Sequence, residues 1–210
     1  MKARAFLTFV LALAACAVSA TAAAAPPALT FAGGTPREQQ QVVDALAASS
    51  FDWSRLPGTV TVHIGSSPSG SYATPGNVYL DASLLDAGVF SWGVVLHEFG
   101  HQVDFLLLDD ADRTVLQAAL GAQDWCYSIP GLQHSDYGCE RFASELAWAY
   151  WQSPENSMAP AATHDESDAL PPAEFRSLVA QLLSPSRIAF ATRVHRGGCC
   201  FGTDVLPDDQ

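Results

Sequence analysis

Hydrophobic residues in the first half of the chain recur with two different periods. Between Arg37 and Ala48 they follow helical spacing, whereas from Gly58 to Gly65 valine and isoleucine alternate with polar residues. Alternation with a period of two among β-branched residues is typical of a half-buried strand. A segment rich in serine, glycine and proline then predicts a loop from Ser66 to Gly76, and a second short strand follows from Asn77 to Asp81.

The second half of the chain predicts a series of helices. Ser91 is placed to cap the first of them, which extends to about Leu108 and is apolar on most of its sides. Such a helix lies in the middle of a domain, because all its faces must be covered. Three more helices are predicted, from Asp110 as the cap to Gly121, from Cys139 to Gln152, and from Pro171 or Pro172 to Ser184.

The order of these elements predicts the fold class. A helix and two strands are followed by helices, which is typical of an α+β fold with a small N-terminal sheet and further helices packed behind it. Residues 123–138 are expected to be irregular, and 153–170 to form a polar linker or surface loop. Residues 26–200 can form one domain with its own core, followed by an acidic tail over 201–210.

Residues 1–25 have the composition of a targeting segment. Lys2 and Arg4 give a basic start, and an uncharged apolar run extends from Ala5 to Val18 before a series of small residues. That order is typical of a secretory signal peptide, which predicts a secreted protein. Leu13-Ala14-Ala15-Cys16 also resembles a bacterial lipobox, so a lipid anchor at Cys16 is the alternative, and an acyl adduct in the mass of the mature protein would decide for it.

Acidic residues outnumber basic ones in the rest of the chain. Of the ten basic side chains, Lys2 and Arg4 leave with the leader, so eight arginines remain against 22 Asp and Glu, a net charge of −14. A surface of this sign repels phosphate backbones, which argues against nucleic acid as a partner. No later stretch approaches the roughly 20 apolar residues of a membrane-spanning helix. We therefore predict no membrane span, and we expect a monomer.

Four cysteines follow the leader, at positions 126, 139, 199 and 200. An even number of cysteines in an exported chain indicates two disulfides. A bond between the adjacent Cys199 and Cys200 would be strained, so each is expected to pair with Cys126 or Cys139. A cysteine zinc site is the alternative, although no two of these cysteines have the C-x-x-C spacing of such sites.

The most informative segment is His97-Glu98-Phe99-Gly100-His101, inside the central predicted helix. Residues four apart lie on one face of a helix, so His97 and His101 can bind one metal ion together. Zinc suits two imidazoles and a carboxylate. Glu98 lies about 100° around the helix from His97, where it can take a proton from a water molecule that the metal acidifies. Chance produces this pattern only about 0.006 times in a chain of this composition.

A catalytic zinc needs a third protein ligand and one open position. Where a metzincin carries that ligand, six residues after His101, this chain has Leu107, so the ligand must come from a later element. Glu140 shares a helix face with small residues that allow close approach, whereas Glu145 has Arg141 one turn earlier as an ion-pair partner. We therefore predict His97, His101 and Glu140 as the metal ligands, and Glu145 as a solvated or supporting residue.

Gly100, inside the same predicted helix, indicates a close contact with another part of the backbone. A glycine inside a helix costs about 1 kcal/mol relative to alanine. That cost is explained if the backbone of the sheet or of a second helix must pass close to the glycine.

His97-Glu98-Phe99-Gly100-His101-Gln102-Val103-Asp104 and Glu140-Arg141-Phe142-Ala143, with Tyr137 shortly before them, resemble the gluzincin metallopeptidases. The likeness is to the family of the anthrax lethal factor catalytic domain, and it covers residues 91–108 and 137–151. The resemblance implies a zincin-like fold, Glu140 as the third zinc ligand and a nearby tyrosine that stabilises the oxyanion. The family usually has an acidic residue soon after the Phe-Ala pair, where this chain has Ser144.

Several other residues have candidate roles around such a site. A phenol near zinc can donate a hydrogen bond to the tetrahedral intermediate, which makes Tyr137 a catalytic candidate, with His134 as the substitute. Asp104 lies on nearly the same helix face as His101 and could orient a ligand imidazole. The strand Asn77–Asp81 is expected to be the edge strand beside the cleft, along which a substrate peptide adds main-chain hydrogen bonds.

Together these features predict a secreted zinc endopeptidase that acts on peptide or protein substrates, with Glu98 as the general base. One alternative is a catalytically silent binding module with a zincin fold. Another is a zinc amidase for a non-protein amide such as a cell-wall peptide, because the motif does not separate classes of amide. A third alternative, a structural secreted domain, predicts no bound metal.

Overall fold

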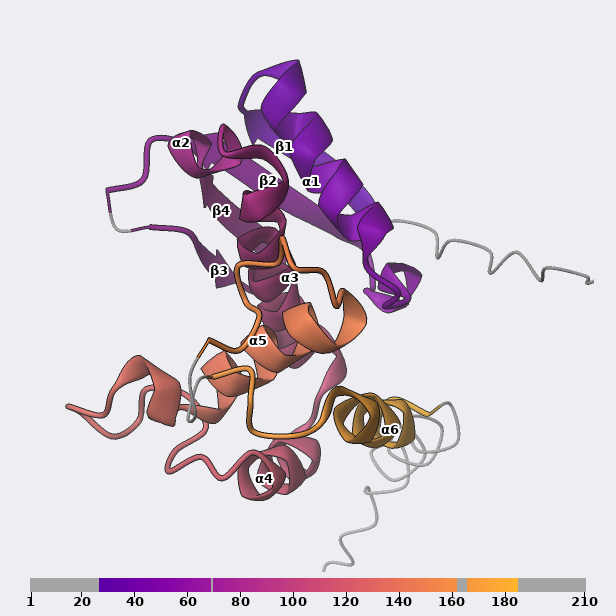
Figure 1. Cartoon of the computed structure of the whole chain (residues 1–210), viewed down its shortest axis with the longest axis vertical. Coiled ribbons are helices and arrows are strands. Elements are labelled where there is room, and N and C mark those ends of the chain that lie inside the picture. The colour runs from indigo at the N-terminus through magenta and orange to yellow at the C-terminus, as the bar shows by residue number, and fades with distance from the viewer. Residues whose placement is uncertain (1–26, 69, 162–165, 185–210) are drawn as a thin grey trace, which may run out of the picture.

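The structure, a computed structural model, describes residues 27–68, 70–161 and 166–184. A sheet and its helices form the first part of the fold, and the second part is helical (Figure 1). In chain order the first elements are β1 (Ala28–Gly33), α1 (Pro36–Ala48), η1 (Trp53–Arg55), β2 (Thr59–Gly65), β3 (Tyr72–Thr74), β4 (Asn77–Asp81), α2 (Ala82–Leu85), η2 (Gly88–Ser91) and α3 (Trp92–Leu107). They are followed by α4 (Asp110–Ala119), η3 (His134–Asp136), α5 (Gly138–Tyr150) and α6 (Pro172–Leu182). The predicted signal peptide with Cys16, the cysteines at 199 and 200 and the acidic tail lie outside the described residues.

The sheet has four strands in the order β1-β2-β4-β3. β1, β2 and β4 are parallel, and β3 runs antiparallel to β4. In β2 the buried Val60, Val62 and Ile64 alternate with more exposed residues, as the sequence pattern predicts. Side chains of α1 and α3 pack in the same core as these strand residues. The predicted α+β class, a small sheet with helices behind it, is therefore confirmed.

Two strands are missing from the sequence-based prediction. β1 has only two large apolar residues, and β3 is three residues long inside the segment that is rich in serine, glycine and proline. Both strands depend on pairing with a stronger neighbour, β1 with β2 and β3 with β4. Because β3 occupies the edge, β4 is an interior strand, and the prediction that Asn77–Asp81 forms the edge is wrong.

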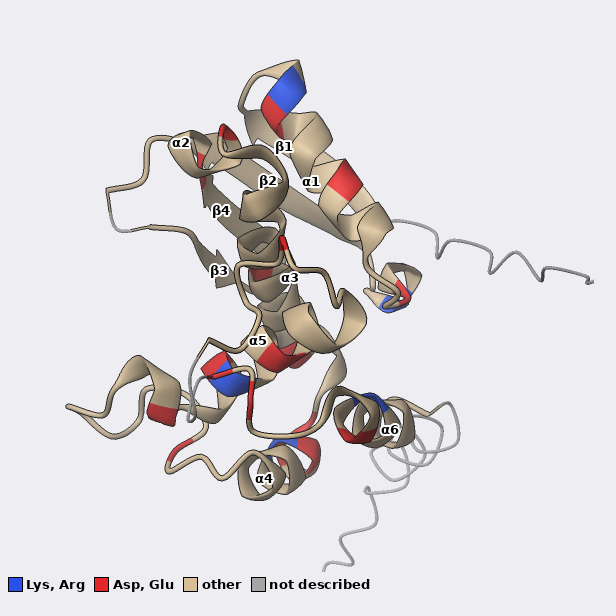
Figure 2. Ribbon diagram, viewed as in Figure 1, with Lys and Arg blue, Asp and Glu red and all other residues tan. Residues whose placement is uncertain are grey.

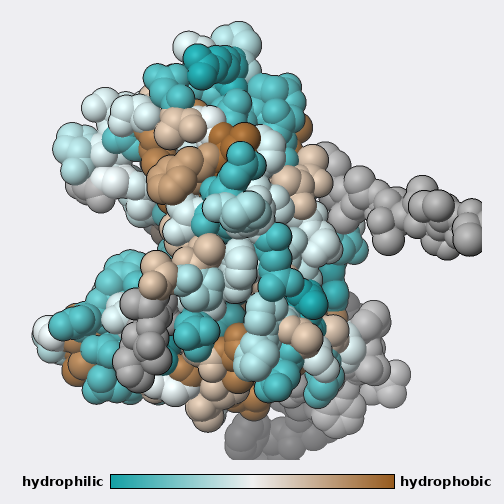
Figure 3. Space-filling model, viewed as in Figure 1, coloured by the Kyte–Doolittle hydropathy of each residue, from teal (hydrophilic) through white to brown (hydrophobic). Residues whose placement is uncertain are grey.

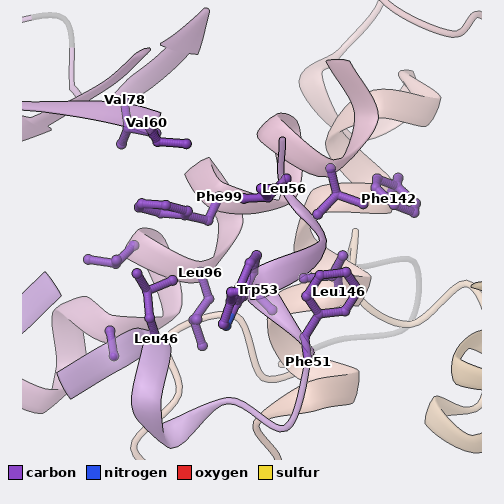
Figure 4. Close-up of a cluster of buried hydrophobic side chains, with 14 of the residues drawn as sticks. Leu46, Phe51, Trp53, Leu56, Val60, Val78, Leu96, Phe99, Phe142 and Leu146 are labelled. Carbon is purple, nitrogen blue, oxygen red and sulfur yellow. The ribbon is translucent and has the colours of Figure 1, made fainter. Parts of the chain in front are cut away.

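The helix α3 is central, as its apolar pattern predicts. On its core side, Phe99 meets the ring of Trp53 edge-on at 5.8 Å between centroids, among side chains from α1, the sheet and α5 (Figure 4). Burial of each large apolar side chain contributes about 1.5–3 kcal/mol. Phe99 lies two residues after His97, about 200° around the helix. The core therefore fixes α3 from the side opposite to the histidines.

Gly100 marks the place where α3 and α5 touch. A Cβ atom added at Gly100 would lie 2.9 Å from the Cα atom of Ala143 in α5. No side chain fits at that distance from a neighbouring backbone, so the close crossing of the two helices requires the glycine. The expectation that a second helix passes close to Gly100 is confirmed.

Two predicted helix caps differ in the structure. The Ser91 hydroxyl donates to the carbonyl of Gly88 and makes no cap bond to α3, because the preceding turn η2 continues into the helix. The cap of α4 is Asp109 rather than Asp110, since Asp109 accepts from the backbone of Asp112 and Asp112 returns the bond. With three acidic residues among four, the sequence allows either register.

The segment between α5 and α6 contains no helix or strand in its described residues, as predicted. It is not only a surface loop, because Asn156 and Ser167 are buried. The Asn156 side chain donates to the carbonyls of Ala147 and Trp151, which holds the segment against α5. None of the helices in the described part of the chain is long and apolar enough to cross a membrane.

A disulfide joins Cys126 to Cys139. The chain around residue 125 runs along the start of α5, where the amides of Gly138 and Cys139 donate to the carbonyls of Asp124 and Trp125. This pairing brings the two sulfur atoms together across 13 residues of sequence. The prediction that the cysteines at 199 and 200 each pair with one of these two is therefore wrong.

Candidate metal centre

The two histidines of the motif lie one turn apart on α3 and converge on one point. Their Nε2 atoms are 3.1 Å apart, and their rings stand nearly perpendicular to each other. Both residues are 7% exposed. The i, i+4 spacing thus produces the paired imidazoles that the sequence predicts, on the face of α3 opposite to the core.

Glu140 completes a triangle of ligand atoms. Its Oε2 atom lies 3.2 Å from Nε2 of His97 and 3.2 Å from Nε2 of His101. Zinc holds such ligands at about 2.0–2.1 Å in a tetrahedron, which separates neighbouring ligand atoms by about 3.3–3.4 Å. The three side chains therefore fit a zinc ion closely, and they form a candidate metal-binding group.

The electrostatics of Glu140 also fit a cation site. Burial alone would raise the pKa of its carboxyl, but the close imidazoles of His101, His134 and His97 hold that pKa far below its usual range. Although buried, Oε2 has no hydrogen bond of normal geometry among the described residues. Oε1 accepts instead from the Tyr127 hydroxyl at 2.7 Å. One carboxylate oxygen is thus held by a hydroxyl, and the other lies among the histidine nitrogen atoms, at the point where a cation would bind.

Glu98 lies beside this triangle with an unused carboxylate oxygen. The residue is 4% exposed, and its Oε2 atom has no hydrogen-bond partner in the described part of the chain. Burial raises the pKa of the Glu98 carboxyl, and the nearby Glu140 adds to the effect while the histidines oppose it. A buried carboxylate oxygen without a protein partner is suited to bind a water molecule and to take its proton.

Glu145 lies on another side of α5 and takes no part in the triangle. It is fully buried, and its Oε1 accepts from the amide of Leu170 at 2.7 Å. The expected ion pair with Arg141 is absent from its hydrogen bonds, because Arg141 donates to the carbonyls of Leu120 and Ser135. The interpretation of Glu145 as solvated is wrong, since the segment that precedes α6 covers it.

We expect Glu145 to make stability depend on pH. Burial raises its pKa to about 7, so the folded chain binds this proton more tightly than the unfolded chain does. The free energy of unfolding should therefore fall as the pH rises through this range, by about 3 kcal/mol between pH 4.5 and 8 from this group. In Glu145→Gln that contribution should vanish.

Urea unfolding of metal-free protein at several pH values measures the effect. The exposed Glu174→Gln provides a control that removes the same charge. Identical pH profiles for wild type and Glu145→Gln would contradict the expectation.

The phenol next to the candidate metal ligands is that of Tyr127. The Tyr137 hydroxyl donates to the carbonyl of Ile129, and its ring packs against that of Tyr127 at 4.3 Å between centroids. Tyr127 has φ of 57°, and among the described residues other than glycine it alone has positive φ. Such a backbone costs about 1–3 kcal/mol and persists only where its surroundings hold it. Tyr127 is fixed on several sides, by the disulfide at the neighbouring Cys126, by its bond to Glu140 and by the ring of Tyr137.

His134, the substitute candidate, faces the same point. Its Nε2 lies 3.1 Å from Oε2 of Glu140, and its Nδ1 lies 2.7 Å from Oε1 of Glu166. These two carboxylates raise the pKa of His134 to about 10. The carboxylate of Asp104, by contrast, accepts hydrogen bonds from the Arg113 guanidinium and the Trp125 indole. It therefore forms no bond with His97 or His101.

The ligand triangle opens into a cleft of about 320 Å³. One wall is the edge strand β3 with the residue before it, and the other is the loop that begins at Cys126. In Figure 3 the molecule is hollowed between these two parts. The lining residues are Ser71, Tyr72, Ala73, His97, Glu98, His101, Phe105, Cys126, Tyr127, His134 and Glu140. Neither lysine nor arginine is among these lining residues. In the fold as a whole, aspartate and glutamate are spread over most elements (Figure 2).

Gln102 holds the edge strand β3 against α3. This fully buried residue follows His101, donates to the carbonyls of Thr74 and Asn77, and accepts from the amide of Gly76. These bonds fix the turn between β3 and β4. The sequence signal for this role is a lone amide side chain in an apolar helix, and no role for Gln102 could be predicted from it.

Comparison of the chain with protein families, curated proteins and solved structures gives no match. The likeness to gluzincins stays a hypothesis that rests on the motif residues quoted above.

Proposed function

We propose that the chain is a zinc metallopeptidase with a zincin-like fold of the gluzincin type. One observation carries the proposal: Nε2 of His97, Nε2 of His101 and Oε2 of Glu140 lie within 3.1–3.2 Å of one another. Two neutral imidazoles and a carboxylate are a set of ligands that catalytic zinc uses. The zincin-like fold is supported by two features. The helix α3 with the two histidines lies beside the edge strand β3, and the third ligand, Glu140, lies on α5.

The chemistry follows from the donors and acceptors at the cleft. A bound zinc ion would supply Lewis-acid chemistry, since it polarises a carbonyl and lowers the pKa of water. Glu98 accepts the proton of the attacking water on its unpartnered Oε2 and passes that proton to the leaving amine. The burial of Glu98 keeps its carboxylate out of bulk water and close to the reacting atoms.

Tyr127 and His134 are the hydrogen-bond donors on the open side of the site. Both line the cleft, and both contact the Glu140 carboxylate. Burial and Glu140 raise the pKa of the Tyr127 hydroxyl, so it remains a donor at neutral pH. To donate to the negative charge that develops on the carbonyl oxygen of the substrate, either group must exchange its bond with Glu140 for a bond to that oxygen. The role that the sequence suggests for Tyr137 thus passes to Tyr127 in our proposal.

The edge strand β3 supports a peptide substrate. Its free edge lies along the cleft, where an extended peptide can pair with the backbone around Tyr72 and Ala73. Such pairing places a peptide bond next to the ligand triangle without a demand for particular side chains. We therefore propose an endopeptidase that acts on peptides or proteins. The Cys126–Cys139 disulfide supports action outside the cytoplasm, because disulfides persist in oxidising compartments.

Metal content and hydrolysis of casein, measured on the same purified protein, test the proposal. We expect one zinc ion per chain, loss of hydrolysis on chelation, and full recovery with one equivalent of zinc. Protein that takes up no zinc would contradict the proposal entirely. Stoichiometric zinc without hydrolysis of casein would indicate the binding module, and hydrolysis confined to cell-wall peptides would indicate the amidase.

A further inference from the structure

Glu166 reaches the metal centre from the segment between α5 and α6. Its Oε2 lies 3.0 Å from the Ser144 hydroxyl, which in turn lies 3.0 Å from Nδ1 of His97. Its Oε1 lies 2.7 Å from Nδ1 of His134. One carboxylate is thus bonded to His134 directly and to His97 through the Ser144 hydroxyl.

The direction of each hydrogen bond is fixed by the number of protons available. Burial alone would raise the pKa of Glu166, but the bond and charge of His134 hold that pKa below its usual range, so Glu166 is an acceptor only. Ser144 must therefore donate its single proton to Glu166 and accept from Nδ1–H of His97. With Nδ1 protonated, the lone pair of His97 is on Nε2, which faces His101 and Glu140.

We propose that Glu166 is a positioning residue of the metal centre, which acts on His97 through the Ser144 hydroxyl and on His134 directly. The inference rests on the proposed zinc function. Glu166 lies 22 residues after Ser144 in the sequence. Its carboxylate supplies, beside the Ser144 hydroxyl, the negative charge that a serine lacks. A carboxylate behind a ligand histidine fixes its tautomer and raises its basicity.

The fold holds this carboxylate in place. Ser167, next to Glu166, is buried, and the amide of Leu170 donates to the buried Glu145 of α5. Ser144 is itself 1% exposed, so water does not compete for its hydroxyl. The side chain of Glu166 is 20% exposed, which agrees with its bonds to Ser144 and His134.

Zinc affinity, measured by competition with a chromophoric chelator, tests the proposal on the full chain. Glu166→Ala should bind zinc about 10- to 100-fold more weakly than wild type, which is the usual cost of losing a residue behind a ligand. The double variant Ser144→Asp/Glu166→Ala should recover most of this loss. It places a carboxylate directly beside Nδ1 of His97, and the shortened side chain at 166 leaves room for the larger aspartate. Glu155→Ala, at an exposed glutamate of the same segment, should leave the affinity unchanged.

The outcomes separate this inference from the proposed function. If wild type binds no zinc, the proposed function fails. If wild type binds zinc and Glu166→Ala binds it equally well, only the inference about Glu166 is overturned. If the double variant binds no more tightly than Glu166→Ala, the loss reflects disturbed packing, and the positioning role is overturned as well.

Discussion

A Glu98→Gln variant is expected to bind zinc as wild type does and to hydrolyse peptides about 100- to 10,000-fold more slowly. Glutamine has nearly the shape of glutamate, but its amide cannot accept the proton of the attacking water. Oε2 of Glu98 has no partner among the described residues, so the substitution breaks no bond of that atom that holds the fold. The value of kcat/KM on a quenched fluorescent peptide, together with zinc content, measures the effect.

The exposed Glu155→Gln is the control for this experiment, because it removes the same charge away from the cleft. It should keep full activity. A zinc-loaded Glu98→Gln variant with kcat/KM within about tenfold of wild type would exclude Glu98 as the general base.

A Glu140→Gln variant is expected to lose zinc and, with it, hydrolysis. The substitution replaces a charged ligand oxygen by a neutral one, at a point that lies 3.2 Å from two histidine nitrogen atoms. The fall in zinc affinity should exceed the about 10- to 100-fold expected for a residue behind a ligand. Chelator competition measures the affinity, and added zinc should restore part of the activity at high concentration.

Glu145→Gln is the matched control, since it makes the same change on the same helix at another buried glutamate. It should leave zinc affinity unchanged at neutral pH. If Glu140→Gln bound zinc as tightly as this control, the third ligand would have to be a different residue.

The helices of ten or more residues and the two regular strands could be predicted from the sequence because their signals are local. The period of Val60, Val62 and Ile64 is a property of consecutive residues, and so is the i, i+4 spacing of His97 and His101. The short strand β3 could not be predicted in this way, because its three residues become a strand only by pairing with β4. Because β3 pairs with β4, the edge of the sheet and one wall of the cleft are formed by a segment whose sequence is typical of a loop.

The choice of Glu140 over Glu145 depended on which helix face carries small residues. That pattern is visible in the sequence, and the contact of Gly100 with Ala143 explains why it brings Glu140 to the histidines. The tyrosine was harder to assign. Tyr137 precedes α5 directly, but its hydroxyl is bonded to Ile129, whereas Tyr127, next to the disulfide-bonded Cys126, donates to Glu140.

By itself, the sequence determined the α+β class, the central helix with its paired histidines and the adjacent glutamate, since each is encoded by the spacing of neighbouring residues. Only the tertiary structure decided the disulfide partner of Cys139, the edge strand, the roles of Gln102 and Tyr127, and the position of Glu166 beside Ser144. The physical reason is distance along the chain. Contacts between segments that lie far apart in sequence are set by how the helices and strands pack. The spacing of neighbouring residues does not encode these contacts.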